Sequence, residues 1–371
     1  MKTAAISAFS IDELKQKISA LDFTPTLAFV FSDIKFSISQ IQNVFTDIDL
    51  FGATSAGEII NDKFNLGSIS ALLLDLPRDK YRIFFEKNAA YRQWTASGLS
   101  LGSFAKKNFS NPAIVLSAPG FAGGDFIIKG INFQLPDNTT IIGGFAGDDL
   151  SFSKAQVYTN LHSTDDGVVA VIFDADRVLV DGLAVNGWPT FGTQYVITEA
   201  KENIVYKIND KPALEVFKQV YNIPDSEIEN LVNNFGPKYP ALVTRYSRPP
   251  VLRHPIKADI NTGALIFSAF IPNMSEIDFG LPATEDILIT TAEKLKAVKD
   301  KHPDIDALIM FSCKARHLAF GTNIIKEIST VYSYWSVPTA GLFTYGEIGI
   351  SSDGKTDFHN ETFNVLVLKE K

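Results

Sequence analysis

Gly341-Leu-Phe-Thr-Tyr-Gly-Glu-Ile-Gly349 is the stretch of sequence from which the fold of this chain can be worked out. The same skeleton occurs earlier as Phe51-Gly-Ala-Thr-Ser-Ala-Gly-Glu-Ile59, with the same spacing from the first glycine to the Gly-Glu pair. A looser third copy is Gly143-Gly-Phe-Ala-Gly-Asp-Asp149. Each copy follows an apolar run of strand length. We therefore interpret the three loops as parts of one supersecondary unit that is used repeatedly.

The segments around each loop predict the architecture of this unit. A buried strand ends at Ser32, Ser117 or Ser312, a helix follows, and a second strand enters the glycine loop. Continuous apolar strands suit a sheet that is covered on both faces. We expect the two strands joined by the helix to be parallel and the later strands to be antiparallel. The predicted fold class is α/β, with two related domains whose mixed β-sheets are flanked by helices and built from repeated strand–helix–strand–glycine-loop units.

Size, charge and cysteine content limit the classes of protein to consider. A length of 371 residues favours two domains. The net charge of -8 argues against nucleic acid or an anionic membrane as a general partner. No apolar run approaches the roughly 20 residues that a membrane-spanning helix needs. Because the single Cys313 cannot form an internal disulfide and suits a reducing compartment, we expect a cytoplasmic protein.

The character of the sequence changes between the second and third units. Residues 222–250 are polar and rich in proline. We place a domain boundary near residue 225, which gives domains at 1–225 and 226–371. Before this boundary, residues 162–167 carry a turn signal, and we expect them to join strands at 155–159 and 167–173 in a hairpin.

The glycine loops carry the polar groups with which the chain could bind a ligand. Glycine lets backbone N–H groups approach a ligand closely, and open α/β sheets bind ligands at loops that follow buried strands. We place Arg316 nearest the last loop, and Arg253 belongs to a second basic group; a guanidinium can hold a carboxylate in two parallel hydrogen bonds. The candidate ligand-binding residues are Thr54, Ser55, Glu58, Asp148, Arg253, Arg316, Thr344, Tyr345 and Glu347. The same residues could instead form turns, cap helices and make internal ion pairs.

A serine hydrolase is an alternative interpretation of the first loop. Gly52-Ala-Thr-Ser-Ala-Gly57 is similar to a nucleophile elbow, but Ala53 stands two positions before Ser55, where the elbow has glycine. Ser117, at the end of a strand, is a second candidate nucleophile.

Metal and haem chemistry depend on the histidines. The sequence has neither a cysteine pair nor a His-x-x-His motif for zinc. A haem would need an axial ligand, for which His254, His317 and His359 are candidates.

Four stretches of the chain together resemble the FIST family. They are Phe51–Ile59, Ile142-Gly-Gly-Phe-Ala-Gly-Asp148, Ser312-Cys-Lys-Ala-Arg316, and Gly341–Ile348 with Phe358-His-Asn-Glu-Thr362. The resemblance covers the chain from about Leu27 to Thr362. It implies an N-terminal and a C-terminal FIST domain, which we assign to the two domains proposed above.

The resemblance implies a sensory input module for small ligands, with amino acids proposed for the family and haem-binding nitric oxide sensors as a subset. We therefore expect a non-catalytic protein without a cofactor that binds a small polar metabolite, such as an amino acid, in a cleft lined by the glycine loops. Arg316 would hold an acidic group, and Glu58 or Glu347 an ammonium. The signal would pass to a kinase, cyclase or chemotaxis partner in trans. A haem-binding nitric oxide sensor and a serine hydrolase remain the alternatives.

Overall fold

Three six-stranded mixed sheets have equivalent strand orders. The computed structural model describes residues 1–88, 93–120, 123–230 and 236–371. Each sheet consists of an edge strand, a long antiparallel strand, two parallel strands and a short hairpin. The first sheet contains β1 (Lys2–Ala8), β6 (Ile69–Asp75), β2 (Leu27–Ser32), β3 (Asp49–Thr54), β10 (Val157–Tyr158) and β11 (Ser163–Thr164). The second contains β7 (Tyr81–Lys87), β12 (Gly167–Asp174), β8 (Pro112–Ser117), β9 (Ile141–Gly144), β24 (Glu347–Ile350) and β25 (Thr356–His359). The third contains β13 (Val178–Val185), β26 (Phe363–Glu370), β22 (Ala307–Cys313), β23 (Thr339–Thr344), β4 (Glu58–Ile60) and β5 (Lys63–Asn65).

The two strands that enclose a helix are parallel in every sheet, as the sequence predicts. The parallel pairs are β2 with β3, β8 with β9, and β22 with β23. Among the helices are α1 (Ile11–Ser19), α2 (Ile38–Gln42), α3 (Trp94–Asn108), α4 (Gly124–Asn132), α6 (Glu285–Lys301), α7 (Lys314–Phe320) and α8 (Ile324–Ser333). The α/β class with mixed sheets is thus confirmed. In the described ranges, no helix is both long enough and apolar enough to cross a membrane.

The inner faces of the three sheets share one hydrophobic core. Phe31 of the first sheet meets Phe311 of the third, with ring centroids 6.3 Å apart, and Val169 of the second sheet belongs to the same cluster. The outer faces pack against helices in three separate clusters. Because both faces are covered, the central strands are apolar along their whole length instead of alternating.

We number the glycine loops in chain order: the first lies at 51–59, the second at 143–149 and the third at 341–349. The strand that follows each loop leaves its own sheet and completes another. β4 follows the first loop but pairs with β23 of the third sheet. β24 follows the third loop but pairs with β9 of the second. β10, which follows the second loop, pairs with β3 of the first. The three units therefore exchange strands in a cycle.

Two glycines of the first loop are required by this exchange. Gly52 lies opposite Tyr158 of the incoming β10, and a Cβ atom on Gly52 would lie 2.0 Å from the tyrosine ring. Gly57 has φ +134°, which L side chains rarely adopt, at the point where the chain crosses to the third sheet.

The hairpin predicted at residues 162–167 is not formed. β10 pairs with β11, so the turn lies at residues 159–162. β12 instead lies between β7 and β8 in the second sheet. The apolar β12 belongs there because it can be buried on both faces between these neighbours.

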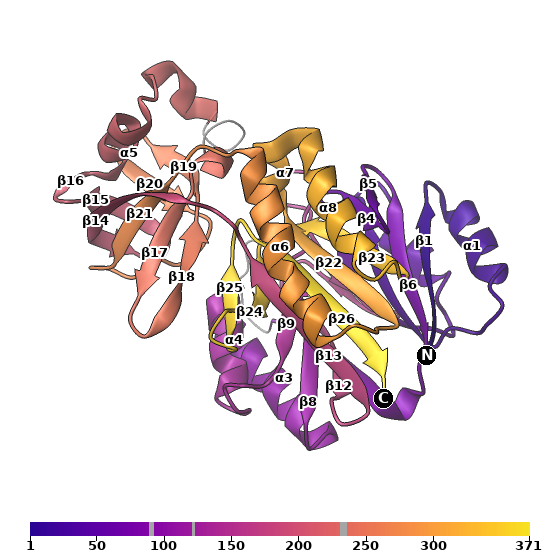
Figure 1. Cartoon of the computed structure of the whole chain (residues 1–371). Coiled ribbons are helices and arrows are strands. Elements are labelled where there is room, and N and C mark those ends of the chain that lie inside the picture. The colour runs from indigo at the N-terminus through magenta and orange to yellow at the C-terminus, as the bar shows by residue number, and fades with distance from the viewer. Residues whose placement is uncertain (89–92, 121–122, 231–235) are drawn as a thin grey trace.

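We call the unit that forms most of each six-stranded sheet a repeat. A separate β-rich unit is inserted into the third repeat, between β13 and α6 (Figure 1). We call residues 190–280 the insert. It contains β14 (Thr190–Lys201), β15 (Ile204–Ile208), β16 (Lys211–Pro212), α5 (Ala213–Tyr221), β17 (Ala241–Arg245), β18 (Arg248–Arg253), β19 (Pro255–Asp259), β20 (Ala264–Phe267) and β21 (Glu276–Gly280). Its strands form one further sheet with its own core, which includes Phe217 and Phe279.

The contact between Gly52 and Tyr158 generates a prediction about stability. We expect Gly52→Ala to destabilise the protein by about 1–3 kcal/mol, because the new methyl group overlaps a fully buried ring. Chemical denaturation gives the free energy of unfolding. Gly52→Ala should cost much less in a Tyr158→Ala background; an equal cost in both backgrounds would contradict the proposed steric cause.

Candidate functional site

The three glycine loops meet and hydrogen-bond to one another. The N–H of Gly147 donates to the carbonyl of Thr54, and the N–H of Ala56 donates to the carbonyl of Phe343. The N–H of Tyr345 completes the cycle by donating to Phe145. The structure thus brings seven of the predicted residues together as buried groups: Thr54, Ser55, Glu58, Asp148, Thr344, Tyr345 and Glu347.

The Glu58 carboxyl group of the first loop is fully buried and held by serines. It contacts the Ser55 hydroxyl, while the N–H and hydroxyl of Ser68 donate to its second oxygen at 2.8 and 2.9 Å. Burial raises the pKa of Glu58 to about 7. The group is therefore at least partly protonated near neutral pH.

Glu347 of the third loop has an equivalent environment. Its carboxyl group contacts the Thr344 hydroxyl and accepts from the Thr362 hydroxyl at 2.7 Å. Burial raises the pKa of Glu347 to about 8. The Thr344 hydroxyl also lies 3.1 Å from the carbonyl oxygen of Ser312. A hydroxyl group has only one hydrogen to donate, so it cannot donate to both the Ser312 carbonyl and the Glu347 carboxyl group. Both contacts are satisfied when Glu347 carries a proton and donates to Thr344.

Asp148 of the second loop is different, because it is ionised and surrounded by donors. It accepts from the Tyr345 hydroxyl at 2.7 Å, from Ser151, and from the N–H groups of residues 152–154. Burial alone would raise its pKa, but these hydrogen bonds, led by that from Lys154, bring the pKa of Asp148 below its ordinary value. Asp148 thereby ties the second loop to the third.

Arg316 is fully buried. Its guanidinium pairs with Glu327, which is also fully buried, and donates to Thr291 and to the carbonyls of Asn186 and Glu361. For Arg316 to hold an acidic group of a ligand, Glu327 would have to be displaced.

Arg253 lies beside an open cavity that none of the other predicted residues lines. It is buried and donates to the carbonyls of Leu252 and Phe358. Its guanidinium lies 3.5 Å from a carboxylate oxygen of Asp125 and 5.6 Å from the centre of the Phe358 ring. Since Asp125 and Phe358 line the cavity, Arg253 supports the wall from behind.

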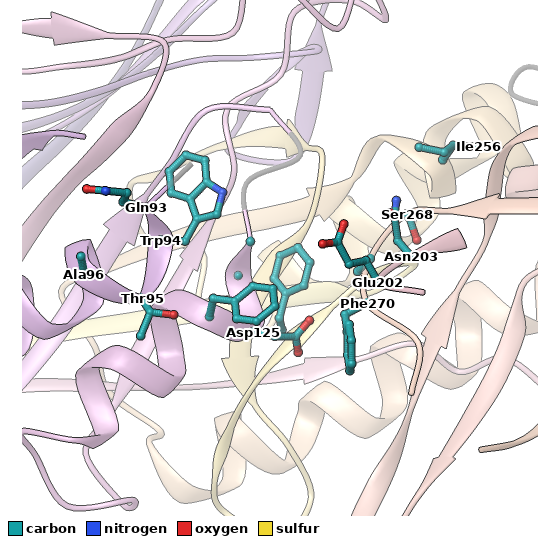
Figure 2. Close-up of a pocket in the computed structure, with 15 residues that line it drawn as sticks. Gln93, Trp94, Thr95, Ala96, Asp125, Glu202, Asn203, Ile256, Ser268 and Phe270 are labelled. Carbon is teal, nitrogen blue, oxygen red and sulfur yellow. The ribbon is translucent and has the colours of Figure 1, made fainter. Parts of the chain in front are cut away.

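The cavity measures about 700 Å³ and lies between the second repeat and the insert (Figure 2); we call it the interface pocket. The second repeat contributes the first turns of α3 and α4, and the insert contributes groups near β15, β19 and β20. The described lining residues are Gln93, Trp94, Thr95, Ala96, Gly123, Gly124, Asp125, Phe126, Glu202, Asn203, Ile256, Ser268, Ala269, Phe270 and Phe358.

The helices α3 and α4 both have their N-termini at this pocket. Gly98 packs against residue 127 of α4 and Gly102 against residue 131, so the two helices advance in the same direction. Their N-termini, with the positive ends of both helix dipoles, therefore lie on the same side as the lining residues 94–96 and 124–126.

The pocket was not predicted from the sequence, although one signal was present. Gly120, Gly123 and Gly124 follow the strand that ends at Ser117, and Gly123 and Gly124 line the pocket. A Cβ atom on Gly124 would lie 2.2 Å from the Phe358 ring. This glycine thus allows the aromatic ring to close on the first turn of α4.

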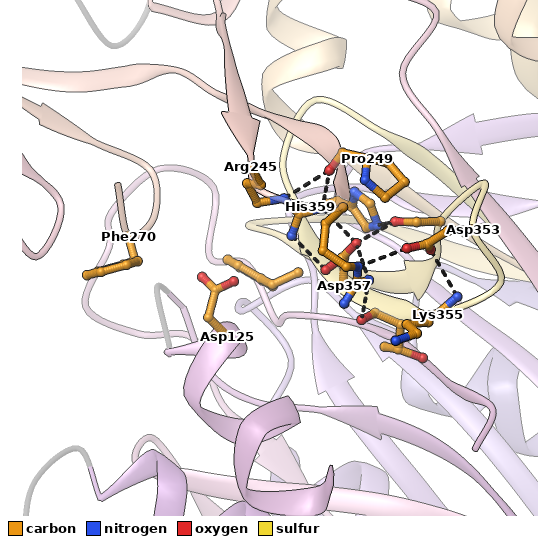
Figure 3. A network of polar contacts seen from close by, with 12 residues as sticks. Asp125, Arg245, Pro249, Phe270, Asp353, Lys355, Asp357 and His359 are labelled. Atoms are coloured by element: carbon orange, nitrogen blue, oxygen red, sulfur yellow. Dashed lines mark hydrogen bonds and ion pairs between the residues drawn. The ribbon is translucent and has the colours of Figure 1, made fainter. Parts of the chain in front are cut away.

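Ion pairs join the insert to the second sheet beside the pocket (Figure 3). Arg245 makes two hydrogen bonds to Asp357 of β25, at 2.7 and 2.8 Å. Arg248 bonds Asp357 at 2.8 Å and Asp353 at 2.9 Å. Burial tends to raise the pKa of Asp357, but Arg245 and Ser351 lower it below its ordinary value. These arginines hold the insert against the repeat that forms the opposite wall.

The interface pocket does not supply a haem ligand among its described lining residues, and the two candidate serines are engaged in other contacts. None of the described lining residues of the interface pocket is a His, Cys, Met or Tyr that could ligate a haem iron. Ser55 contacts Glu58, and Ser117 donates to the carbonyl of Gly144 at 2.7 Å. Neither serine has a histidine partner among the described hydrogen bonds.

Comparison with known proteins identifies both halves of the chain. Residues 26–211 match the model of the FIST N domain. Residues 213–350 match the model of the FIST C domain. A search of curated proteins finds no match.

The two buried glutamates generate a prediction about pH. An unfolded chain releases their protons near the ordinary glutamate pKa, whereas the folded protein retains them until about pH 7 and about pH 8. The folded state binds more protons in this range, so the free energy of unfolding decreases as the pH rises through it. We expect Glu347→Gln, whose amide resembles the protonated acid, to gain Tm relative to wild type between about pH 5 and about pH 9.

Glu276→Gln, at an exposed glutamate, is the matched control and should show no such gain. A constant Tm difference between Glu347→Gln and wild type would mean that Glu347 is ionised throughout this range.

Arg316 provides a second prediction. We expect Arg316→Ala to lower the free energy of unfolding by about 3–5 kcal/mol, because Glu327 would be left buried and unpaired. The double variant Arg316→Met/Glu327→Leu should be more stable than Arg316→Ala. Denaturation curves for the three proteins measure this; an Arg316→Ala variant as stable as wild type would show that the ion pair is dispensable.

Proposed function

The chain belongs to the FIST family, whose domains are small-ligand-binding sensory domains of signal transduction. On this premise we propose that the protein is a non-catalytic sensor of a small polar metabolite, such as an amino acid, and that the interface pocket is its ligand site. A ligand there would touch residues matched by both family models, because residues 93–126 lie in the first match and residues 256–270 in the second.

The observation that carries the proposal is the position of the pocket. It lies beyond the carboxyl end of β8, where the chain enters α4, and this is the edge at which α/β sheets bind ligands. The three repeated glycine loops lie at comparable strand ends, but their backbone groups bond to one another. We therefore place the ligand against Gly123 and Gly124 instead of in a cleft of the repeated loops.

The lining suits a molecule that carries both charges. The N-termini of α3 and α4 favour a carboxylate. Asp125 and Glu202 lie on opposite walls of the pocket and can receive an ammonium (Figure 2). Trp94, Phe126 and Phe270 supply apolar surface for the rest of the ligand.

The ion pairs beside the pocket offer a route to an output. A ligand that contacts both walls would change the position of the insert relative to the second sheet. Arg245 and Arg248 of the insert are joined to that sheet through Asp357. In this proposal a kinase, cyclase or chemotaxis component reads that change in trans in the cytoplasm.

Mass spectrometry of the small molecules that the purified protein carries tests this proposal. Wild type should release a compound in stoichiometric amount on denaturation. Ala96→Trp should lose it, because the new indole fills space at the exposed first turn of α3. Ala20→Trp, at the exposed end of α1, is the control and should retain it. Equal amounts in Ala96→Trp and wild type would exclude the interface pocket as the site.

A further inference from the structure

The walls of the interface pocket are aromatic and acidic. Four rings line it, those of Trp94, Phe126, Phe270 and Phe358. Phe126 and Phe270 come from opposite walls, with ring centroids 6.2 Å apart. Two carboxylates, Asp125 and Glu202, accompany them. Of the described residues that line the pocket, none is lysine or arginine.

Arg253 does not neutralise this lining completely. Its guanidinium approaches Asp125 to 3.5 Å, but its hydrogen bonds go to the carbonyls of Leu252, Phe358 and Phe270 and to Asn360. The side chain of Asp125 is 34% exposed, so its carboxylate faces the pocket as well as the arginine. One oxygen of Asp125 thus remains able to attract a ligand cation.

The Phe358 ring already interacts with a cation. The buried guanidinium of Arg253 lies 5.6 Å from its centroid. Aromatic faces attract cations through their quadrupole, and cages of aromatic rings recognise quaternary and methylated ammonium groups. A primary ammonium needs a hydrogen-bond acceptor for each of its three N–H groups, whereas rings satisfy methyl groups on nitrogen without hydrogen bonds.

We propose that the interface pocket selects a zwitterion whose ammonium is alkylated, the class that includes N-methylated amino acids and betaines. The ammonium lies among Trp94, Phe126 and Phe270 and near Asp125. The carboxylate lies at the N-termini of α3 and α4. The inference rests on the proposed function and specifies the class of ligand for the same site.

Titration calorimetry with three probes tests the ammonium and its alkyl groups separately. Glycine betaine and 3,3-dimethylbutanoate have the same shape and carboxylate, but only betaine has the positive charge. Glycine has the charge without the methyl groups. We expect betaine to bind at least about tenfold more tightly than either of the others.

Variants identify the groups responsible for this preference. Asp125→Asn should weaken the binding of betaine several-fold and leave that of 3,3-dimethylbutanoate unchanged or improved. Asp137→Asn, at an exposed aspartate that does not line the pocket, should affect neither probe. Phe270→Leu, at a partly exposed ring, should weaken betaine binding without affecting the fold.

The outcomes separate this inference from the proposed function. If 3,3-dimethylbutanoate or glycine binds as tightly as betaine, or if betaine does not bind at millimolar concentration, the preference for an alkylated ammonium is overturned. The assignment of the pocket itself is tested separately, and it fails if Ala96→Trp retains the natural compound.

Discussion

Hydrogen bonding at the open edge of each parallel strand pair is the constraint on which the rest of the structure depends. An edge strand such as β3, β9 or β23 presents unpaired N–H and C=O groups, which are costly when buried. Each edge is satisfied by a strand from another repeat. The three sheets cannot therefore be completed independently. This mutual completion brings the loops to one point and buries Glu58 and Glu347 in them.

The same arrangement explains why the repeated loops and the interface pocket differ in character. The loops use their backbone groups to hold the exchanged strands, which leaves Glu58 and Glu347 enclosed, with pKa values raised to about 7 and about 8. In the second repeat, α3 and α4 begin beside an extra glycine pair, and the insert covers them from the other side. Arg253 extends from β18 of the insert to Asp125 at the start of α4. The pocket thus combines a strand end common to all three repeats with one wall from α3 and α4 of the second repeat and another from the insert in the third.

The sequence predicted the repeating unit because its signals are local. The Gly-Glu skeleton and the serines that end the strands lie within each unit, and the parallel pairs follow from strand–helix–strand order. The strand exchange could not be predicted, because the residues of β4 and β24 suit several partners and the choice depends on register between distant segments. Arg316 and Glu327 are only eleven residues apart in the sequence, so an ion pair between them is a local contact that the sequence allows. The interface pocket could not, because Trp94, Asp125, Glu202 and Phe270 form no motif along the chain.

The central claim is that the ligand binds at the interface pocket and not at the repeated loops. Hydrogen exchange monitored by mass spectrometry, on protein freed of bound small molecules and measured with and without the protein-free small-molecule fraction of a cell extract, tests it most directly. The account predicts that the small molecules slow exchange at residues 94–98, 123–127 and 268–270, which surround the pocket. Slower exchange confined to the loops at 54–58 and 344–347, with no change around the pocket, would contradict it.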